Sequence, residues 1–199
     1  DSVPKSVTYR VIEPILHIQE SVRLLCREGK LANLLTEMSV NRLDMVIADR
    51  SMPTNLNVRA YNHLLGESTL SVFATNNLAK NHKGPSLPSR LDNAPFLLPG
   101  EDFAIQKRLI QWFESQKIHP RIVGEFDDSA LLKSFGQAGA GFFGAPTAIA
   151  DYVCRQYGVE KLGQIDTISE QLYAITTERR LTHPAVIAVI KATSELYST

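Results

Sequence analysis

The sequence predicts an α/β protein with mostly parallel strands. Short apolar runs with the character of strands alternate with longer segments whose apolar residues recur at the helical period, and this alternation is typical of βαβ units. The 199 residues are 44% hydrophobic and 21% charged, an ordinary composition for a globular protein. A chain of this length buries enough surface to fold as one large domain or as two small lobes.

The first half of the chain begins with a predicted helix from about Pro4, which Pro14 interrupts or ends. In a βαβ protein such a helix normally follows a strand, so the pattern predicts a strand just before the chain begins. The next elements are predicted in this order: a strand at 21–27, a helix at 30–42, a buried strand at 43–48, and two β-rich segments at 58–65 and 69–75.

Residues 76–95 are rich in Asn, Lys, Gly, Pro and Ser and are predicted to form a surface connection. After it the alternation of strands and helices restarts, which predicts a second α/β unit. Its strands are predicted at 96–98, 121–126 and 141–145, and its helices at 102–117, 129–138 and 146–156. A late strand is predicted at 171–176 and a last helix from Pro184 onward. Gly136, Gly139 and Gly141 lie between a helix and a strand, so they are expected to stop the helix and not to bind phosphate.

The charges of the chain balance, with 21 Lys and Arg against 21 Asp and Glu. Such a chain lacks the positive field that binding to phosphate backbones requires. Cys26 and Cys154 each lie in an apolar run without a second Cys or His at metal-ligand spacing, so both are expected to be buried free thiols in a reducing compartment. No apolar run is long enough to span a bilayer and the first residues are not a signal peptide, so we expect a cytoplasmic protein.

The five histidines are scattered and none pairs with another at ligand spacing. His183, which precedes Pro184, is predicted to start the last helix. No serine nucleophile elbow, P-loop or metal-binding motif is present. Because no catalytic constellation can be assembled, we do not expect an enzyme.

Polar side chains follow the carboxyl ends of the predicted strands, where open α/β sheets bind ligands. Helix capping alone explains many of them. Asp127 and Asp128 are adjacent, so one can cap a helix while the other needs a different partner. With Glu125 nearby, this acidic group suits a hard cation or an ammonium group, or forms a solvated acidic rim. The five turns are 28–30, 49–50, 99–102, 127–129 and 146–147.

Several motifs resemble one known family. The run GEFDDSALLKSFG at 124–136, followed by GFFGAPT at 141–147, resembles the effector-binding domain of LysR-type transcriptional regulators. The likeness is closest to the NhaR-like subgroup, which activates sodium/proton antiporter genes. It covers nearly the whole chain, with further similar runs SVPK at 2–5, LDMVIAD at 43–49, LLGES at 64–68, LLPG at 97–100, ERR at 178–180 and HPAV at 183–186.

The resemblance implies a periplasmic-binding-protein-like (type II) fold, in which two Rossmann-like lobes are joined by two crossover strands and the effector lies in a cleft between them. It implies lobe I at 1–75 plus 174–199 and lobe II at 76–173. In the family a strand precedes Asp1, and a linker helix and a winged helix-turn-helix precede that strand. The cleft positions carried over from the family are Ser2, Val3, Glu28, Gly29, Lys30, Asp49, Gly100, Glu101, Asp127, Asp128, Ser129, Ala145, Pro146 and Thr147.

The resemblance also implies partners. A homodimer or homotetramer is expected through a helix at 4–13 of one chain against a helix at 102–117 of another, with DNA bound only through the N-terminal domain that this sequence lacks. Membrane binding is not expected. The subgroup implies activation of Na+/H+ antiporter genes in response to Na+, Li+ or pH, with a monovalent cation at Asp127, Asp128 and Glu101.

One departure from the family leaves two interpretations open. Many LysR-type regulators bind organic anions through hydroxyl groups and helix N-termini, yet here the same positions are rich in Asp and Glu, which repel a carboxylate. Either the effector is a cation, or Lys30 and Arg50 neutralise the acids and the effector is something else. The alternative function is a solute-binding protein of a transporter with the same fold; an enzyme such as a deaminase-type lyase ranks third.

Overall fold

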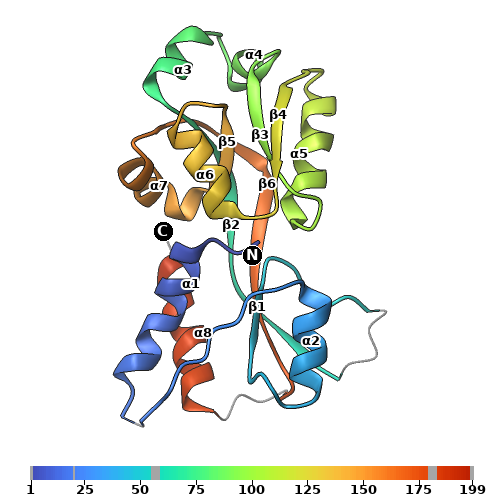
Figure 1. The fold of residues 1–199 in the computed structure, drawn as a ribbon, viewed down its shortest axis with the longest axis vertical. Helices are drawn as coiled ribbons and strands as arrows, with labels where there is room; N and C mark the ends of the chain where they lie inside the picture. The colour runs from blue at the N-terminus through green and yellow to red at the C-terminus, as the bar shows by residue number, and fades with distance from the viewer. Residues whose placement is uncertain (1, 20, 55–58, 179–182, 198–199) are drawn as a thin grey trace. The chain divides into compact units, whose positions relative to one another are not determined.

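The computed structural model describes residues 2–19, 21–54, 59–178 and 183–197. The chain divides into two compact α/β units (Figure 1). The first unit contains Val3–Glu67 and Gln171–Thr199, and the second contains Ser68–Glu170 together with Ser2. The family resemblance implied boundaries after residue 75 and after residue 173, a few residues later in the chain than these divisions.

Two long strands belong to both units. β2 (Tyr61–Ala74) and β6 (Glu160–Thr176) are neighbours in a four-stranded sheet of order β1-β6-β2-β5. The sequence predicted two β-rich segments where β2 is one strand, and only the last six residues of β6. The prediction of mostly parallel strands is wrong for this sheet, because β1 (Val46–Ala48) pairs antiparallel with β6 and β5 (Phe143–Pro146) pairs antiparallel with β2.

The first unit packs helices around β1 and the adjoining part of β6. α2 (Leu31–Ser39) lies within the predicted helix and buries Leu35 and Met38 against β1 and Ile175. α1 (Lys5–Ile12) packs against α8 (Pro184–Tyr197). Pro14 is the second residue of the short 3-10 helix η1 (Glu13–His17), which follows α1 directly. His183 accepts a hydrogen bond at its ring from the Ala185 N–H, so it starts α8 as predicted.

The predicted strand at 21–27 is wrong, because residues 21–30 form neither strand nor helix. A strand is stable only when a neighbour satisfies its backbone groups, and no described strand pairs with this segment. Leu24, Leu25 and Cys26 are exposed there. The prediction of two buried thiols is therefore also wrong: both cysteines are free, but Cys26 is exposed and Cys154 is half-buried.

The second unit follows the predicted order closely. β3 (Pro95–Pro99) pairs in parallel with β4 (Arg121–Phe126), and Phe96 forms a parallel bridge to Phe142 at the start of β5. α5 (Ala104–Ser115), α6 (Ser129–Gln137), η2 (Thr147–Ile149) and α7 (Ala150–Tyr157) occupy the predicted helical segments. The segment 76–95 is more than a connection, because it contains α3 (Asn76–Asn81) and α4 (Leu87–Leu91).

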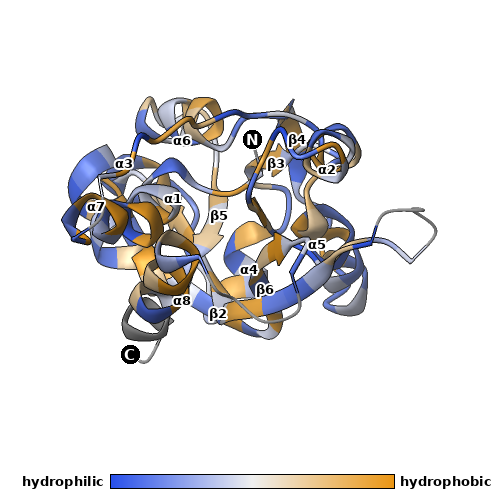
Figure 2. Cartoon of the chain, turned by 90° about the horizontal axis from the view of Figure 1, so that it is seen from below, coloured by the Kyte–Doolittle hydropathy of each residue, from blue (hydrophilic) through white to orange (hydrophobic). Residues whose placement is uncertain are grey.

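The core of the second unit is aromatic and aliphatic. Phe96 and Phe142 are fully buried, and the Phe96 ring meets the Phe113 ring of α5 edge-on at 5.1 Å. Figure 2 shows hydrophobic and hydrophilic residues on the same helices, as expected of helices with one buried face. Across the described part of the chain, no helix has the length and hydropathy needed to cross a bilayer.

Candidate functional site

Three strands of the second unit end at the same edge. β3 runs parallel to β4. The Leu97 N–H donates to the Phe142 carbonyl and the Phe142 N–H donates to the Pro95 carbonyl, which aligns β3 with the residue that precedes β5. Gly100, Asp127 and Thr147 each directly follow one of these strands. We call this set of strand ends the carboxyl edge. The Gly100 N–H donates to the Phe126 carbonyl at 2.7 Å, which joins the ends of β3 and β4.

The two adjacent aspartates at the carboxyl edge have different environments. Asp128 is the N-cap of α6, and its Oδ1 accepts a hydrogen bond from the Leu131 N–H at 2.6 Å. Asp127 is exposed, and its carboxylate lies beside Gly100, where a Cβ would overlap it. Glu101 is also exposed. Within residues 2–19, 21–54, 59–178 and 183–197, no three His, Cys, Asp or Glu side chains come together as a metal site.

Ser129 is the first residue of α6 and is only 7% exposed. Its Oγ is buried and has no hydrogen-bond partner in the structure. Lys133 follows one turn later on the same face of the helix, and its Nζ donates to the Ser129 carbonyl at 2.8 Å. Gly136 continues this face and lies directly against the Phe143 ring of β5. The face that carries Ser129 therefore covers β5, whose last residues, Ala145 and Pro146, are buried.

A cluster of four hydroxyl side chains surrounds the start of η2. The Thr69 hydroxyl donates to Thr147 Oγ1 at 3.0 Å, and Ser71 Oγ lies 2.7 Å from the same atom. The Ala148 N–H donates to Ser68 Oγ at 3.0 Å. We call Ser68, Thr69, Ser71 and Thr147 the hydroxyl cluster. Of these four residues, only Thr147 was predicted as a site residue from the sequence. The other three lie near Thr147 because β2 pairs antiparallel with β5, with Leu70 opposite Pro146.

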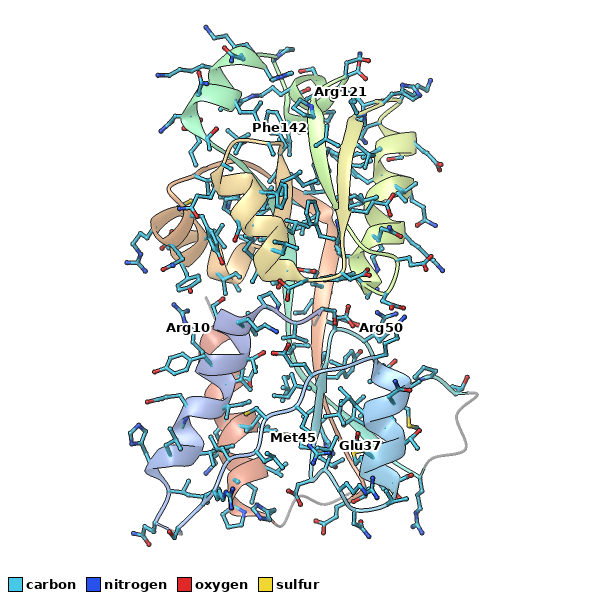
Figure 3. All side chains as sticks on the ribbon, viewed as in Figure 1. Arg10, Glu37, Met45, Arg50, Arg121 and Phe142 are labelled. Carbon is cyan, nitrogen blue, oxygen red and sulfur yellow. The ribbon has the colours of Figure 1, made fainter. Side chains whose placement is uncertain are left out.

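Two of the predicted site residues of the first unit, Glu28 and Asp49, are engaged in ion pairs. Glu28 pairs with Lys5 of α1, and the hydrogen bond from that ammonium lowers the pKa of the Glu28 carboxyl. Arg50, labelled in Figure 3, donates from Nε to Asp49 Oδ1 at 3.1 Å. Arg50 therefore pairs with Asp49, one of the acids that it was expected to neutralise. Glu28 pairs instead with Lys5, a residue that the sequence did not indicate.

The other predicted site residues of the first unit lie just before helices. Lys30 is the N-cap residue of α2, Gly29 precedes it, and Val3 is buried before α1. Ser2 is grouped with the second unit.

The chain is similar in sequence to regulatory proteins. The profile of the family described as the LysR substrate binding domain matches residues 3–197. The transcriptional activator protein NhaR of Escherichia coli (strain K12) is 31% identical over 186 residues, which is 94% of this chain and 60% of that protein. NhaR of Shigella flexneri gives the same values. The chain thus spans about 60% of the length of the curated relatives it matches.

Solved structures share the fold at low sequence identity. The regulatory domain of HypT from Salmonella typhimurium matches with a TM-score of 0.69 and 15% identity, over 96% of this chain and 91% of that one. The effector binding domain of QuiR in complex with shikimate matches with a TM-score of 0.68 and 11% identity, over 99% of this chain and 93% of that one. The predicted periplasmic-binding-protein-like type II fold is confirmed.

Proposed function

The chain belongs to the LysR substrate-binding domain family, and from this membership we propose that it is the effector-sensing part of a bacterial transcription activator, with no catalysis of its own. The observation that carries the proposal is the 31% identity to NhaR over 94% of the chain. Sensing by a LysR-type effector-binding domain requires a ligand that favours one of two conformations. The family match takes up residues 3–197 of the chain, and the matched region is about 60% of NhaR.

The finer part of the proposal is that the effector is Na+ or Li+, or that the response follows pH. The cation version starts from the resemblance to the NhaR-like subgroup, and one observation supports it. The Asp127 carboxylate is exposed at the carboxyl edge while Asp128 is used as a helix cap. Hard cations prefer carboxylate, carbonyl and water oxygens, so Asp127 is the residue on which a cation response depends.

Calorimetric titration tests the cation version. The purified chain is titrated with NaCl, LiCl and KCl at constant ionic strength, alongside Asp127→Asn and the control Asp166→Asn, which changes an exposed carboxylate on β6. We expect saturable heat with Na+ and Li+ that is lost in Asp127→Asn and kept in Asp166→Asn. If neither ion gives saturable heat, the cation version is wrong and the family membership is unaffected.

A chimera tests the regulatory role. The DNA-binding part of Escherichia coli NhaR is joined to this chain in place of the region that the chain matches, and expression is measured from a promoter that NhaR activates. We expect expression to change with the effector while promoter occupancy is maintained. A chimera that occupies the promoter but never alters expression would contradict the proposal and favour the alternative, a solute-binding protein.

A further inference from the structure

We infer that the end of the second unit where β3 and β4 begin is a basic surface that binds the phosphate backbone of DNA without reading its sequence. The inference goes beyond the proposed function, because that function concerns an effector at the carboxyl edge and this surface lies at the opposite ends of the same strands. It rests on the proposed function in one respect, which is that a transcription activator works beside DNA.

Three segments meet where these strands begin. Figure 1 shows α3 and α4 beside the starts of β3 and β4. The Arg90 guanidinium of α4 donates to the carbonyls of Ala79 and His82 at 3.2 Å and 3.1 Å, which joins α4 to the end of α3. The His119 N–H donates to Asp92 Oδ1 at 2.8 Å, which joins the residue after α4 to the turn before β4. We call residues 76–94 and 114–121 the amino end.

The amino end carries five cations and two carboxylates. Arg90 is half-buried and bonded to carbonyls of α3 and the residue after it, whereas the other four cations are exposed. None of these four forms an ion pair with a side chain that the structure describes. They are Lys80, Lys83, Lys117 and Arg121, and Figure 3 labels Arg121 at the start of β4.

The two carboxylates offset this charge only in part. Asp92 accepts hydrogen bonds from the His119 N–H and, at its second oxygen, from the Asn93 side-chain amide at 3.2 Å. Glu114 is exposed at the end of α5 and likewise has no ion-pair partner among the described side chains. Since cations outnumber carboxylates, the amino end keeps a net positive charge.

The compensating acids lie at the other ends of the same strands. Residues 100–102 and 125–128, at and after the ends of β3 and β4, contain five carboxylates and no cation. The balanced charge of the whole chain therefore averages over a basic end and an acidic end of one unit. At physiological salt, a surface field depends on charges within about 10 Å. The lack of a positive field, expected from the total charge, does not hold at the amino end.

The composition of this surface favours a phosphate backbone over a protein partner. Protein interfaces have an apolar centre and are depleted of lysine. Among the large hydrophobic side chains that are exposed in the described ranges, none belongs to the amino end, and Ile122 and Val123 follow it along β4. Three of the four exposed cations are lysines, which contact phosphates as point charges. Such contacts bind DNA without specifying its sequence.

Four phosphate contacts give weak binding on their own. Each contact releases about one counterion, so the logarithm of the association constant should fall with the logarithm of the salt concentration with a slope of about −4. A separate DNA-binding part would hold the duplex nearby at an effective concentration in roughly the millimolar range, where weak contacts contribute. DNA is then contacted by two parts of the activator, and not only by the N-terminal domain that the family resemblance implies.

Titration of the 199-residue chain with a short mixed-sequence DNA duplex at low salt, followed by amide chemical shifts, tests the inference. We expect the largest shifts at 80–83 and 117–121, and a salt slope of about −4. Lys83→Gln and Lys117→Gln should each weaken binding several-fold and reduce the steepness of the slope by about 1. The control is Lys107→Gln, which changes an exposed lysine of α5 outside the amino end and should leave both quantities unchanged.

Three results would overturn the inference: no duplex binding at low salt, shifts confined to another surface, or a slope that neither variant changes. Poly-glutamate of equal charge is titrated in parallel. If it binds the same residues more tightly than the duplex, the surface takes an acidic polypeptide and the inference is also wrong. The ion titration and the chimera measure the proposed function separately, so its failure and the failure of this inference are distinguishable.

Discussion

The Asp127 carboxylate lies where a side chain at position 100 would begin, so Gly100 and Asp127 fit together as a pair. Since the clash is with the end of an exposed, flexible side chain, Gly100→Ala should displace Asp127 and cost less than about 1 kcal/mol of unfolding free energy. Urea unfolding and the amide spectrum check this: the Asp127 and Phe126 signals should move while the core signals stay. A large loss of stability would show that Asp127 is held rigidly.

Gly136 also lies against a neighbouring side chain that leaves no room for a Cβ, but here the neighbour belongs to the core. A Cβ at this position would overlap the Phe143 ring, which is fully buried. The ring cannot move away without disturbing the packing of α6 on β5, so Gly136→Ala should lower the unfolding free energy by about 1–3 kcal/mol. Gly29→Ala is the matched control, because its Cβ would make ordinary contacts with Leu34. Equal stability of the two variants in urea would contradict the packing described for α6.

The N-cap of α6 predicts a modest loss of unfolding free energy when Asp128 is replaced. Asp128→Ala removes the acceptor of the Leu131 N–H and should cost about 1 kcal/mol. Asp128→Ser and Asp128→Asn should recover most of that loss, because both keep an acceptor at the cap. Asp127→Ala, which leaves the cap intact, should change the unfolding free energy far less. If Asp127→Ala is the more damaging substitution, the assignment of the cap is wrong.

The ion pair of Glu28 with Lys5 predicts a pH dependence below the physiological range. Lys5 lowers the pKa of Glu28 in the folded chain, so this carboxyl contributes stability above its unfolded pKa of about 4.3. The contribution is lost as the pH falls below that value, through the folded pKa. Both side chains are about half exposed, at 44% and 54%, so the contribution is at most about 1 kcal/mol.

Glu28→Gln checks the sign of this effect. The variant should be less stable than the wild type at pH 7, and the difference should vanish near pH 3 and shrink in high salt. The unfolding free energy is measured in urea at each pH. A difference that grows as the pH falls would contradict the pairing.

The expected oligomer depends on the exposed faces of α1 and α5. Tyr9 is 66% exposed on α1 and Ile110 is 39% exposed on α5. If these helices pair between two copies of the chain, Tyr9→Glu and Ile110→Glu should each shift the protein toward the monomer, because the new carboxylate is buried without a partner. Light scattering after size exclusion measures the mass. Phe135→Glu, which changes an exposed apolar residue of α6, should leave the mass unchanged.

Local sequence patterns predicted the elements that depend on local interactions. β4 has the predicted bounds, and α6 ends one residue before its predicted end. The Asp-Ser start, the apolar spacing and the glycines after the helix all lie within residues 128–141. Gly139, with φ of 78°, adopts the left-handed conformation expected of a helix stop.

Features that depend on distant partners could not be predicted. Residues 21–27 alternate like a strand, but strand formation requires a neighbour that the described residues do not supply. The hydroxyl cluster depends on the register between β2 and β5, which brings Thr69 within reach of Thr147 across 78 positions of sequence. No local pattern encodes that register. Lys5 and Glu28 meet for the same kind of reason, through the tertiary fold of the first unit.

The chain enters the second unit along β2 and leaves it along β6, and these two strands are hydrogen-bonded neighbours. Apart from Ser2, the second unit is therefore one continuous segment, residues 68–170, that both begins and ends in paired strands. A segment of this kind can be exchanged between related genes as one piece of coding sequence, with both junctions in paired strands. Swapping residues 68–170 between family members should thus give chimeras that combine the second unit of one protein with the first unit of another.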